Sequence, residues 1–247
     1  MNNNSRIILT MAGKYERFRL FGNKVPKYLM PLGKATVLWH VIHELKQSSP
    51  NDEFYLLAND ADRDFKPIIA SILSDFSIPS ENLAYISDTA SQLHTAFDIF
   101  NNFENFHEFT GPIAFSNIDT ILKNRDDFFS SLKSLQDQVC LIDTFTANSH
   151  NYSYILKSED NQVRDVSDHI KLSEMACSGL YGFSSASFFY NYVTDFLQEN
   201  TGAGFSFFYK SLLNNNIEIL NNNNVDTRNT VVLGTPEEYI TSLHKFI

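Results

Sequence analysis

Three residues near the N-terminus have the types and the spacing of a phosphate-binding site. Gly13 follows the apolar run 6–11, and its missing side chain would let the backbone of a turn approach a phosphate closely. Arg17 follows four residues later, and Lys27 follows ten residues after Arg17. Free backbone N–H groups together with two cations suit a nucleoside triphosphate, which carries several negative charges. Taken singly, the glycine could belong to an ordinary strand-to-helix turn, and each cation could be a solvated surface residue.

A carboxylate further along the chain could supply a metal ligand to the same site. Asp119 follows the apolar run 111–116, which predicts a strand. Ligands of open parallel sheets bind beyond the carboxyl ends of the strands, and a carboxylate there can hold Mg²⁺ against nucleotide phosphates. The alternative for a lone aspartate at a strand end is a turn or a helix cap.

Two polar residues in a predicted helix could contact a base or a ribose. Gln92 offers both a donor and an acceptor, which suits the edge of a pyrimidine, and Thr95 lies three residues further on. A polar helix start explains both residues equally well.

The elements that would position these residues alternate along the first part of the chain. The expected strands span 6–11, 53–58, 83–86, 111–116 and 138–144, and the expected helices span 35–48, 62–75, 90–103 and 125–135. Alternation of strand and helix predicts an α/β fold with a mostly parallel sheet that is covered by helices on both faces.

After residue 150 the pattern changes to turn-bounded elements, which predict a small antiparallel layer. The further expected elements are a hairpin at 152–156 and 162–166, strands at 176–183 and 217–220, and helices at 186–199 and 204–213. The asparagine runs around the last strand are polar and turn-prone. A last helix is expected to begin after Thr235. Thr235 is a suitable N-cap, Pro236 suits the first turn, and Glu238 completes a capping box.

The composition limits the class of protein. The 247 residues are 43% hydrophobic and include 22 phenylalanines, enough for a sizeable core. The net charge is −10 and no cluster of Lys or Arg is present, which argues against a nucleic-acid partner. A triphosphate bound by such a chain needs local positive charge and a divalent cation.

Cysteine usage and apolar runs bear on location and assembly. Cys140 and Cys177 are expected to be buried free thiols. The polar start 1–5 and the lack of a long apolar run predict a cytoplasmic protein with no membrane segment. The phenylalanines within 183–208 could supply the interface of a homodimer.

The motifs occur in the order in which sugar-nucleotide pyrophosphorylases carry them. That family's signature reads A-A-G-x-G-x-R-[FLM] and then P-K-x-L-x-P-[LV], which the segments 11–18 and 26–32 resemble. The form beginning Met-Ala-Gly, with Pro-Lys-Tyr in the lysine motif, is most similar to the branch that serves capsule and surface polysaccharides. Further segments resemble the family's base-reading, N-x-D, Glu-Lys, A-G-x-Y-x-F and G-T-P-E-[ED] motifs; these are 88–95, 115–120, 166–169, 178–183 and 234–238.

The resemblance implies a three-layer αβα Rossmann-like sandwich, the nucleotide-diphospho-sugar transferase fold, as a single domain over 1–247. It also implies a nucleotide-binding half at 1–145 and an acceptor-binding half at 146–247. The activity it implies is transfer of a nucleoside monophosphate group from a triphosphate, CTP or dTTP/UTP in our ordering, to a sugar 1-phosphate or similar small phosphorylated acceptor. Pyrophosphate is released and Mg²⁺ is the cofactor.

The same resemblance implies a role for each matching residue. Arg17 would hold the triphosphate tail and Lys27 would offset charge at the α-phosphate. The nucleotide would contact Met11, Ala12, Gly13, Lys14, Gln92, Thr95 and Asn117. The acceptor would contact Asp168, His169, Lys171, Gly179 and Tyr181, although the last two could equally be core residues. Asp119 would bind the metal, with Asp226 as a second candidate ligand.

Three departures from the family pattern leave alternatives open. Tyr15 replaces the second loop glycine. Asp168 and His169 replace the Glu-Lys pair, with Lys171 a substitute if it lies on the same strand face. Val232 precedes Gly234 where many relatives carry a second metal-binding aspartate.

The departures allow a binding protein that has kept the nucleotide pocket and lost its chemistry. A glycosyltransferase of the same fold is a further alternative. It would more often show a D-x-D pair, of which segment 117–119 has only half.

Overall fold

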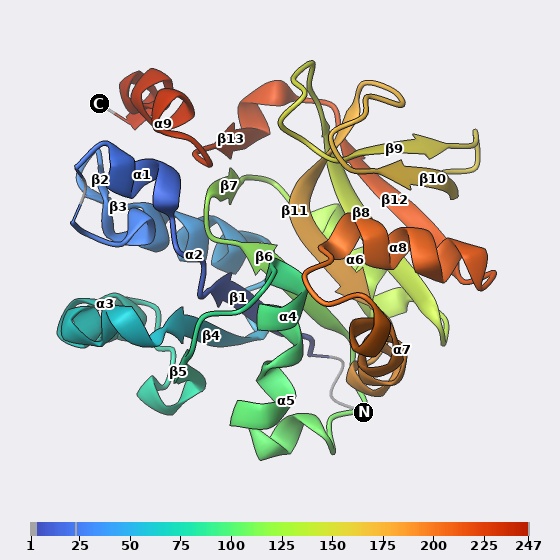
Figure 1. The fold of residues 1–247 in the computed structure, drawn as a ribbon, viewed down its shortest axis with the longest axis horizontal. Helices are drawn as coiled ribbons and strands as arrows, with labels where there is room; N and C mark the ends of the chain where they lie inside the picture. The colour runs from blue at the N-terminus through green and yellow to red at the C-terminus, as the bar shows by residue number, and fades with distance from the viewer. Residues whose placement is uncertain (1–3, 23, 247) are drawn as a thin grey trace.

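The computed structural model describes residues 4–22 and 24–246, and within these ranges nine strands form one mixed sheet. Residues 1–3 of the polar N-terminal start lie outside the described residues. The main path of the sheet runs β10-β9-β11-β6-β1-β4-β5, and β8 pairs with both β11 and β12 (Figure 1).

The centre of the sheet is parallel, as the alternating pattern predicts. β1 (Arg6–Met11) lies between β4 (Glu53–Asn59) and β6 (Ile113–Asn117) and runs parallel to both, while β5 (Leu83–Ile86) continues the parallel order beyond β4. Alternate residues of β1 enter opposite cores, because successive side chains of a strand point to opposite faces. The carboxyl ends of β1, β4 and β6 therefore meet along one edge.

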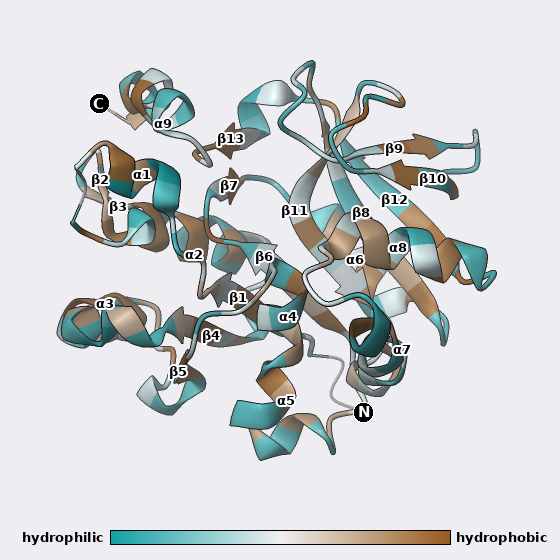
Figure 2. Cartoon of the chain, viewed as in Figure 1, coloured by the Kyte–Doolittle hydropathy of each residue, from teal (hydrophilic) through white to brown (hydrophobic). Residues whose placement is uncertain are grey.

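Helices cover both faces, which confirms a three-layer α/β fold. One layer and its core contain α1 (Glu16–Leu20), α2 (Val37–Ser48), α3 (Lys66–Asp75), α6 (Asp126–Ser134) and α9 (Pro236–Ser242). The other contains α4 (Gln92–Phe97), α5 (Ile99–Asn102), α7 (Ala186–Glu199) and α8 (Phe205–Asn214). Figure 2 shows hydrophobic residues concentrated in the central strands and hydrophilic residues along the outer side of α7.

The second part of the chain adds antiparallel pairing. β11 (Met175–Phe183) runs antiparallel to β6 and to β8 (Val139–Thr146), and β9 (Tyr154–Lys157) and β10 (Val163–Ser167) form the predicted hairpin. Two short antiparallel pairs lie outside the main sheet. They are β7 (Thr120–Leu122) with β13 (Thr230–Val232), and β2 (Pro31–Leu32) with β3 (Ala35–Thr36).

Short 3₁₀ helices connect several of these elements. They span Lys27–Leu29, Asp60–Phe65, Ser80–Asn82, Glu104–Phe106, Thr227–Asn229 and Leu243–Phe246. The helix expected at 62–75 thus begins as a 3₁₀ turn, and the helix expected at 90–103 is divided between α4 and α5.

The asparagine tract is a strand rather than the turn that its composition suggests. β12 (Glu218–Asn224) runs parallel to β8 through all four asparagines 221–224. Asn221 is buried, and its amide donates to the Ile142 carbonyl at 3.2 Å and to the Thr144 hydroxyl at 2.8 Å. The neighbouring strand thus satisfies the donor side of this amide, and tertiary pairing overrides the low strand preference of asparagine.

The phenylalanines between 183 and 208 mostly build the core, which corrects their assignment to an interface. Within this segment, the side chains of Phe183, Phe188, Phe189, Phe205 and Phe208 are buried. Phe207 is 53% exposed. Both cysteines are free, as predicted, and Cys140 is buried, but Cys177 is only half-buried. Within 4–22 and 24–246, none of the helices has the length and apolar character needed to cross a membrane.

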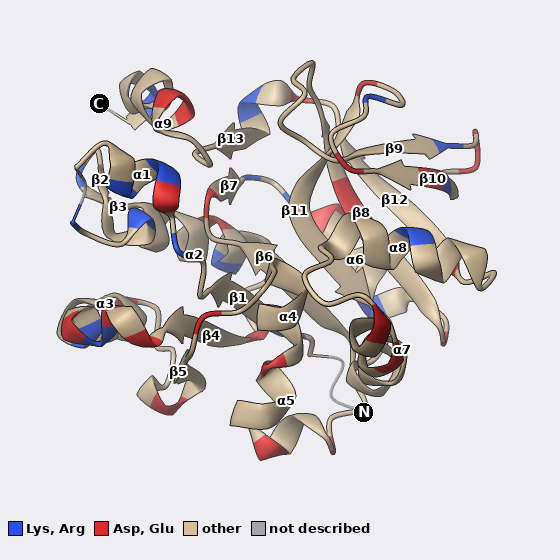
Figure 3. Cartoon of the chain, in the orientation of Figure 1, with Lys and Arg blue, Asp and Glu red and all other residues tan. Residues whose placement is uncertain are grey.

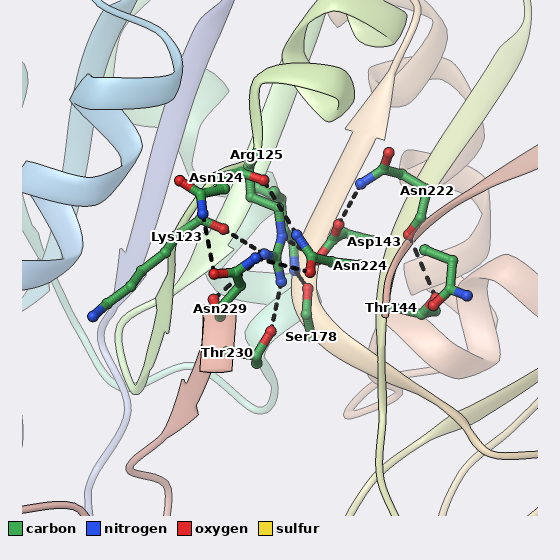
Figure 4. Close-up of polar contacts among 12 residues, drawn as sticks. Lys123, Asn124, Arg125, Asp143, Thr144, Ser178, Asn222, Asn224, Asn229 and Thr230 are labelled. Carbon is green, nitrogen blue, oxygen red and sulfur yellow. Dashed lines mark hydrogen bonds and ion pairs between the residues drawn. The ribbon is translucent and has the colours of Figure 1, made fainter. Parts of the chain in front are cut away.

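A buried ion pair joins the parallel and antiparallel parts of the molecule. The Arg125 guanidinium donates to the Asp143 carboxylate at 2.9 Å, and neither side chain is exposed. Arg125 also donates to the Lys123 carbonyl and the Thr230 hydroxyl, each at 2.6 Å, while the Asn222 amide donates to Asp143 at 2.7 Å (Figure 4). Burial raises the pKa of Asp143, and Arg125 acts against this shift.

Candidate active site

A cleft lies at the edge where the carboxyl ends of β1 and β6 meet. Its central cavity has a volume of about 320 Å³. The lining residues are Thr10, Met11, Gly13, Tyr15, Lys27, Thr89, Ala90, Ser91, Gln92, Thr95, Asn117, Ile118 and Asp119. The parallel sheet thus brings together residues as far apart in the sequence as Thr10 and Asp119, at the edge where open α/β sheets bind ligands.

Two further cavities adjoin the central one through Asp119, which lines all three. One, of about 390 Å³, is lined by Lys14, Tyr15, Glu16, Arg17, Phe18, Lys27, Asp119 and Gly234. The other, of about 170 Å³, is lined by Arg17, Asn117, Asp119, Thr120, Phe145, Asn151, Tyr152, Cys177, Ser178, Val232, Gly234, Thr235 and Glu238. Most of the residues singled out for nucleotide chemistry therefore share one cleft.

Lys27 and Asp119 form an ion pair in the middle of this cleft. The Lys27 Nζ lies 2.6 Å from Oδ2 of Asp119, and the side chains are 18% and 22% exposed. Lys27 begins a 3₁₀ turn whose other two residues, Tyr28 and Leu29, are buried, so the turn is anchored behind the lysine. Arg17 is exposed on α1, and within the described ranges its side chain makes neither a hydrogen bond nor an ion pair. Both cations face space that an anion can enter.

The predicted base-reading residues form a polar wall of the central cavity. The Gln92 amide donates to the Thr10 hydroxyl at 3.0 Å and to the side-chain oxygen of Asn117. Thr95 is buried, and its hydroxyl lies 2.6 Å from that of Thr89. Gln92 and Asn117 are thus positioned by each other, while Thr95 also holds the loop before α4.

Asn59, which the sequence analysis did not identify, connects the turn at Gly13 with the loop before α4. The Asn59 amide donates to the Ala12 carbonyl at 2.9 Å and to the Asp88 carboxylate at 2.8 Å. The Lys14 ammonium lies 3.2 Å from the same carboxylate. These contacts with Asn59 and Lys14 lower the pKa of Asp88. The available signal was the position of Asn59 at the carboxyl end of a predicted strand.

The Asp168, His169 and Lys171 group lies on the loop after β10, not on a strand. The expectation that Lys171 shares a strand face with His169 is therefore wrong, because the strand ends at Ser167 and His169 has a positive φ of 57°. Asp168 accepts from the Ser153 hydroxyl at 2.7 Å, and Lys171 donates to Asn148 at 2.9 Å. The group does not line any of the three cavities around Asp119.

The A-G-x-Y-x-F segment contributes through other residues than expected. Tyr181 is buried in the core and stacks on Phe205 at 4.2 Å between ring centroids, which corrects its assignment to the acceptor pocket. Gly179 has a φ of 90° at an irregularity of β11, and a side chain there would overlap the amide of Asn117. Cys177 and Ser178, which lie two residues and one residue before Gly179, line the cleft instead.

The structure does not bring Asp226 next to Asp119. Val232 pairs with Thr120 beside Asp119, whereas Asp226 precedes the opposite end of the β7–β13 pair. The Asp226 carboxylate binds the Arg228 guanidinium at 2.8 Å, and this contact lowers its pKa to about 2.

Glu238 is the carboxylate that lines the Asp119 side of the cleft. It accepts from the Tyr152 hydroxyl at 2.8 Å and from the backbone N–H of Thr235 at 2.9 Å. A Cβ on Gly234 would lie 3.4 Å from an Asp119 oxygen and 3.5 Å from a Glu238 oxygen. Burial and Glu238 raise the pKa of Tyr152 above its usual range. The sequence indicated Glu238 as part of a helix cap and of the segment that resembles the G-T-P-E-[ED] motif, but not as a residue that lines the cleft.

The donor set around Asp119 suits a metal that arrives with phosphates. Among the described residues, His, Cys, Asp and Glu side chains form no group of three or more that could hold a metal ion. Mg²⁺ is commonly held by one or two carboxylates together with substrate phosphates and water. Asp119, with its carboxylate in the cleft wall, fits that arrangement.

The fold is shared with solved nucleotide-sugar pyrophosphorylases and other nucleotidyltransferases. A nucleoside-diphosphate-sugar pyrophosphorylase from Vibrio cholerae RC9 superposes with a TM-score of 0.83 at 18% identity, covering 96% of this chain and 99% of that one. A putative glucose-1-phosphate thymidylyltransferase from Bacillus anthracis gives 0.76 at 14% identity, with coverages of 98% and 94%. The inositol-1-phosphate CTP transferase of T. maritima gives 0.69 at 11% identity, with coverages of 98% and 95%.

Sequence comparison gives a weaker relationship. No family model matches the chain. The bifunctional protein GlmU of Mycolicibacterium paratuberculosis is 22% identical over an alignment of 192 residues that covers 73% of this chain. The chain spans 37% of the length of that relative.

Proposed function

We propose that this protein is a nucleotidyltransferase that transfers a nucleoside monophosphate group from a triphosphate to a small phosphorylated acceptor, with release of pyrophosphate. The observation that carries the proposal is the cleft around Asp119, which gathers Gly13, Arg17 and Lys27 at the carboxyl edge of the sheet. The shared fold with solved sugar-nucleotide pyrophosphorylases supports it.

The proposed reaction needs positioning and charge stabilisation rather than a side-chain nucleophile. An oxygen of the acceptor phosphate attacks the α-phosphorus, and the bond to the β-phosphate oxygen breaks as pyrophosphate leaves. Lys27 exchanges its ion pair with Asp119 for the α-phosphate, whose negative charge increases during attack, and Arg17 binds the departing pyrophosphate. When bound, Mg²⁺ supplies charge neutralisation on the phosphates beside Asp119.

A pyrimidine nucleotide suits the polar wall of the central cavity. The amide nitrogen of Gln92 is occupied by Thr10 and Asn117, so its oxygen is the group left to accept a hydrogen bond. The exocyclic amino group of cytosine is a donor of the required kind. We therefore order the substrates as CTP before dTTP/UTP.

The acceptor is proposed to be a sugar 1-phosphate. The solved structural relatives include a putative glucose-1-phosphate thymidylyltransferase and an inositol-1-phosphate CTP transferase. The resemblance of the lysine and glycine motifs to the capsule branch supports a product used for surface polysaccharide.

The test is pyrophosphate release by the purified protein with Mg²⁺. Each of CTP, dTTP, UTP, ATP and GTP is combined with glucose 1-phosphate, other sugar 1-phosphates, inositol 1-phosphate and phosphocholine. We expect release that requires both substrates. Hydrolysis independent of the acceptor, or no release with any pair, would contradict the proposal.

A binding protein without chemistry is the second candidate. It is favoured by Val232, which occupies the position beside Asp119 where relatives carry a second metal ligand, while Asp226 is paired elsewhere with Arg228. Nucleotide-dependent thermal stabilisation without pyrophosphate release would select this candidate.

A further inference from the structure

We propose that Asp62 is a positioning residue for the active site. Its carboxylate accepts hydrogen bonds from Tyr15 and Tyr28, and it thereby holds the turn at Gly13 and the 3₁₀ turn of Lys27 together. The inference rests on the proposed nucleotidyl transfer. It assigns a function to Tyr15, the residue that replaces a glycine in the phosphate-binding loop.

The two tyrosine hydroxyls meet at one carboxylate oxygen. The Tyr28 hydroxyl donates to Oδ2 of Asp62 at 2.9 Å, and the Tyr15 hydroxyl donates to the same atom. Asp62 is 3% exposed and Tyr28 is fully buried. The rings of Tyr15 and Tyr28 pack edge to face with centroids 6.1 Å apart. Hydrogen bonds to a carboxylate are stronger than those between neutral groups, and burial protects them from water.

The contact also accounts for an unusual backbone conformation. Tyr15 has φ 40° and ψ 43°, the left-handed region that residues with a side chain rarely adopt. Such a conformation is retained where contacts with the surrounding structure offset its energetic cost, and it is often found at functional sites. Here the hydroxyl bond to Asp62 and the packing on Tyr28 supply that support.

The bridge connects directly to the groups that bind phosphate. Tyr28 follows Lys27 in the same 3₁₀ turn, and Tyr15 is the residue from which α1 begins, two positions before Arg17. Tyr15 also lines both cavities that Lys27 lines. One carboxylate therefore relates the position of Arg17 to that of Lys27, although Asp62 itself is not among the lining residues.

The charge state of Asp62 gives the bridge a measurable signature. Burial raises its pKa to about 6, and the groups around it are Tyr15, Tyr28, Tyr85 and Arg63, whose guanidinium lies over the Tyr85 ring. Protonation removes the charge that strengthens both hydroxyl bonds. Turnover should therefore fall as the pH decreases through about 6.

The test compares four variants. Tyr15→Phe, Tyr28→Phe and Asp62→Asn each weaken the bridge, whereas Tyr85→Phe removes a buried hydroxyl near Asp62 that has no hydrogen-bond partner in the described structure. We measure kcat, the KM of each substrate, nucleotide affinity by calorimetry, and the melting temperature, from pH 5 to 8.

We expect the first three variants to lose about 10- to 100-fold in kcat, with the acceptor KM changed less than about threefold. The loss in kcat of the double variant Tyr15→Phe/Tyr28→Phe should not exceed the product of the losses in the two single variants. The decrease in turnover near pH 6 should be absent from Asp62→Asn. Tyr85→Phe should match the wild type.

Equal kcat in all variants, or losses shared by Tyr85→Phe and parallel to the melting temperature, would overturn the inference. Absence of turnover in the wild type would instead overturn the proposed function. In that case nucleotide affinity decides the inference: a loss of about tenfold in Asp62→Asn supports it, and unchanged affinity refutes it.

Discussion

Lys27 and Asp119 illustrate at the residue scale how the cleft is prepared for an anion. Their ion pair lies in a part of the cleft that is only partly accessible to water, where charge interactions are stronger than on an open surface. A bound triphosphate offers Lys27 several anionic oxygens in place of one carboxylate. In the proposed reaction, this pair would hold the ammonium near the phosphate whose charge Lys27 neutralises.

Replacing Lys27 tests this role. Lys27→Ala is expected to lower pyrophosphate release by about 10²- to 10³-fold or more while the fold is retained, because it removes a donor aimed at developing charge. The measurements are turnover and the melting temperature. Lys24→Ala, which removes an exposed lysine three residues earlier, is the matched control. Wild-type turnover in purified Lys27→Ala would remove Lys27 from the mechanism.

Asp62 gives a prediction on stability that is separate from turnover. Because burial raises its pKa to about 6, the folded protein binds a proton more tightly than the unfolded chain does. Asp62 therefore contributes stability that is present below its unfolded pKa and is lost as the pH rises through about 6. The melting temperature of the wild type, relative to Asp62→Asn, should rise on going from pH 7 to pH 5. An unchanged difference would contradict the assignment of this titration to Asp62.

At the scale of elements, the start of α9 joins a helix cap to the cleft wall. Glu238 completes the capping box with Thr235 and also accepts from Tyr152. One side chain thus stabilises the helix end and fixes a residue of the adjoining cavity.

Glu238→Ala should lower the free energy of unfolding by about 1 kcal/mol or more, because it removes the cap and frees the Tyr152 hydroxyl. Urea denaturation measures the change. Glu237→Ala, at an exposed position in the same helical turn, serves as the control and should have a smaller effect. Equal losses in the two variants would contradict this role.

The irregularity of β11 sets the position of Asn117. Gly179→Ala should weaken nucleotide binding by about 1 to 2 kcal/mol, because the added methyl group displaces Asn117 and its contact with Gln92. Calorimetry with CTP measures the loss. The control is Gly202→Ala. Gly202 has a φ of 91°, close to the 90° of Gly179, but a Cβ there meets open space, so this variant measures the effect of backbone strain alone. A similar loss of affinity in both variants would show that the Asn117 contact is not the cause.

At the scale of the whole molecule, the Arg125–Asp143 pair connects the two parts of the fold. It links the start of α6 with β8, β12 and β13 (Figure 4). Figure 3 shows the Lys and Arg residues scattered among acidic ones along the chain, and α1 carries the two basic residues Arg17 and Arg19. The Arg125–Asp143 pair thus stabilises the fold, whereas Arg17 and Lys27 face the cleft.

Arg125→Met should reduce the free energy of unfolding by about 3 to 5 kcal/mol, because Asp143 would remain buried without its partner. The double variant Arg125→Met/Asp143→Leu should recover much of that loss, since no unpaired charge remains. Guanidinium denaturation of both variants measures the difference. A double variant as unstable as the single one would show that packing, rather than the unpaired charge, dominates.

The sequence by itself determined the main strands and helices and their order along the chain. The strands around 6–11, 53–58 and 111–116 and the capped start of the last helix follow from apolar periodicity and cap residues, which are local properties of the chain. The motif spacing also indicated Gly13, Arg17, Lys27 and Asp119, because a parallel sheet brings its carboxyl ends to one edge.

Only the tertiary structure decided which side chains become neighbours. It paired Tyr15 with Asp62 across 47 residues, buried Tyr181 against Phe205, and placed Lys171 on a loop. It also made the asparagines 221–224 a strand. A side chain's partner and burial depend on packing between distant segments, and one residue's type and its local spacing do not contain that information.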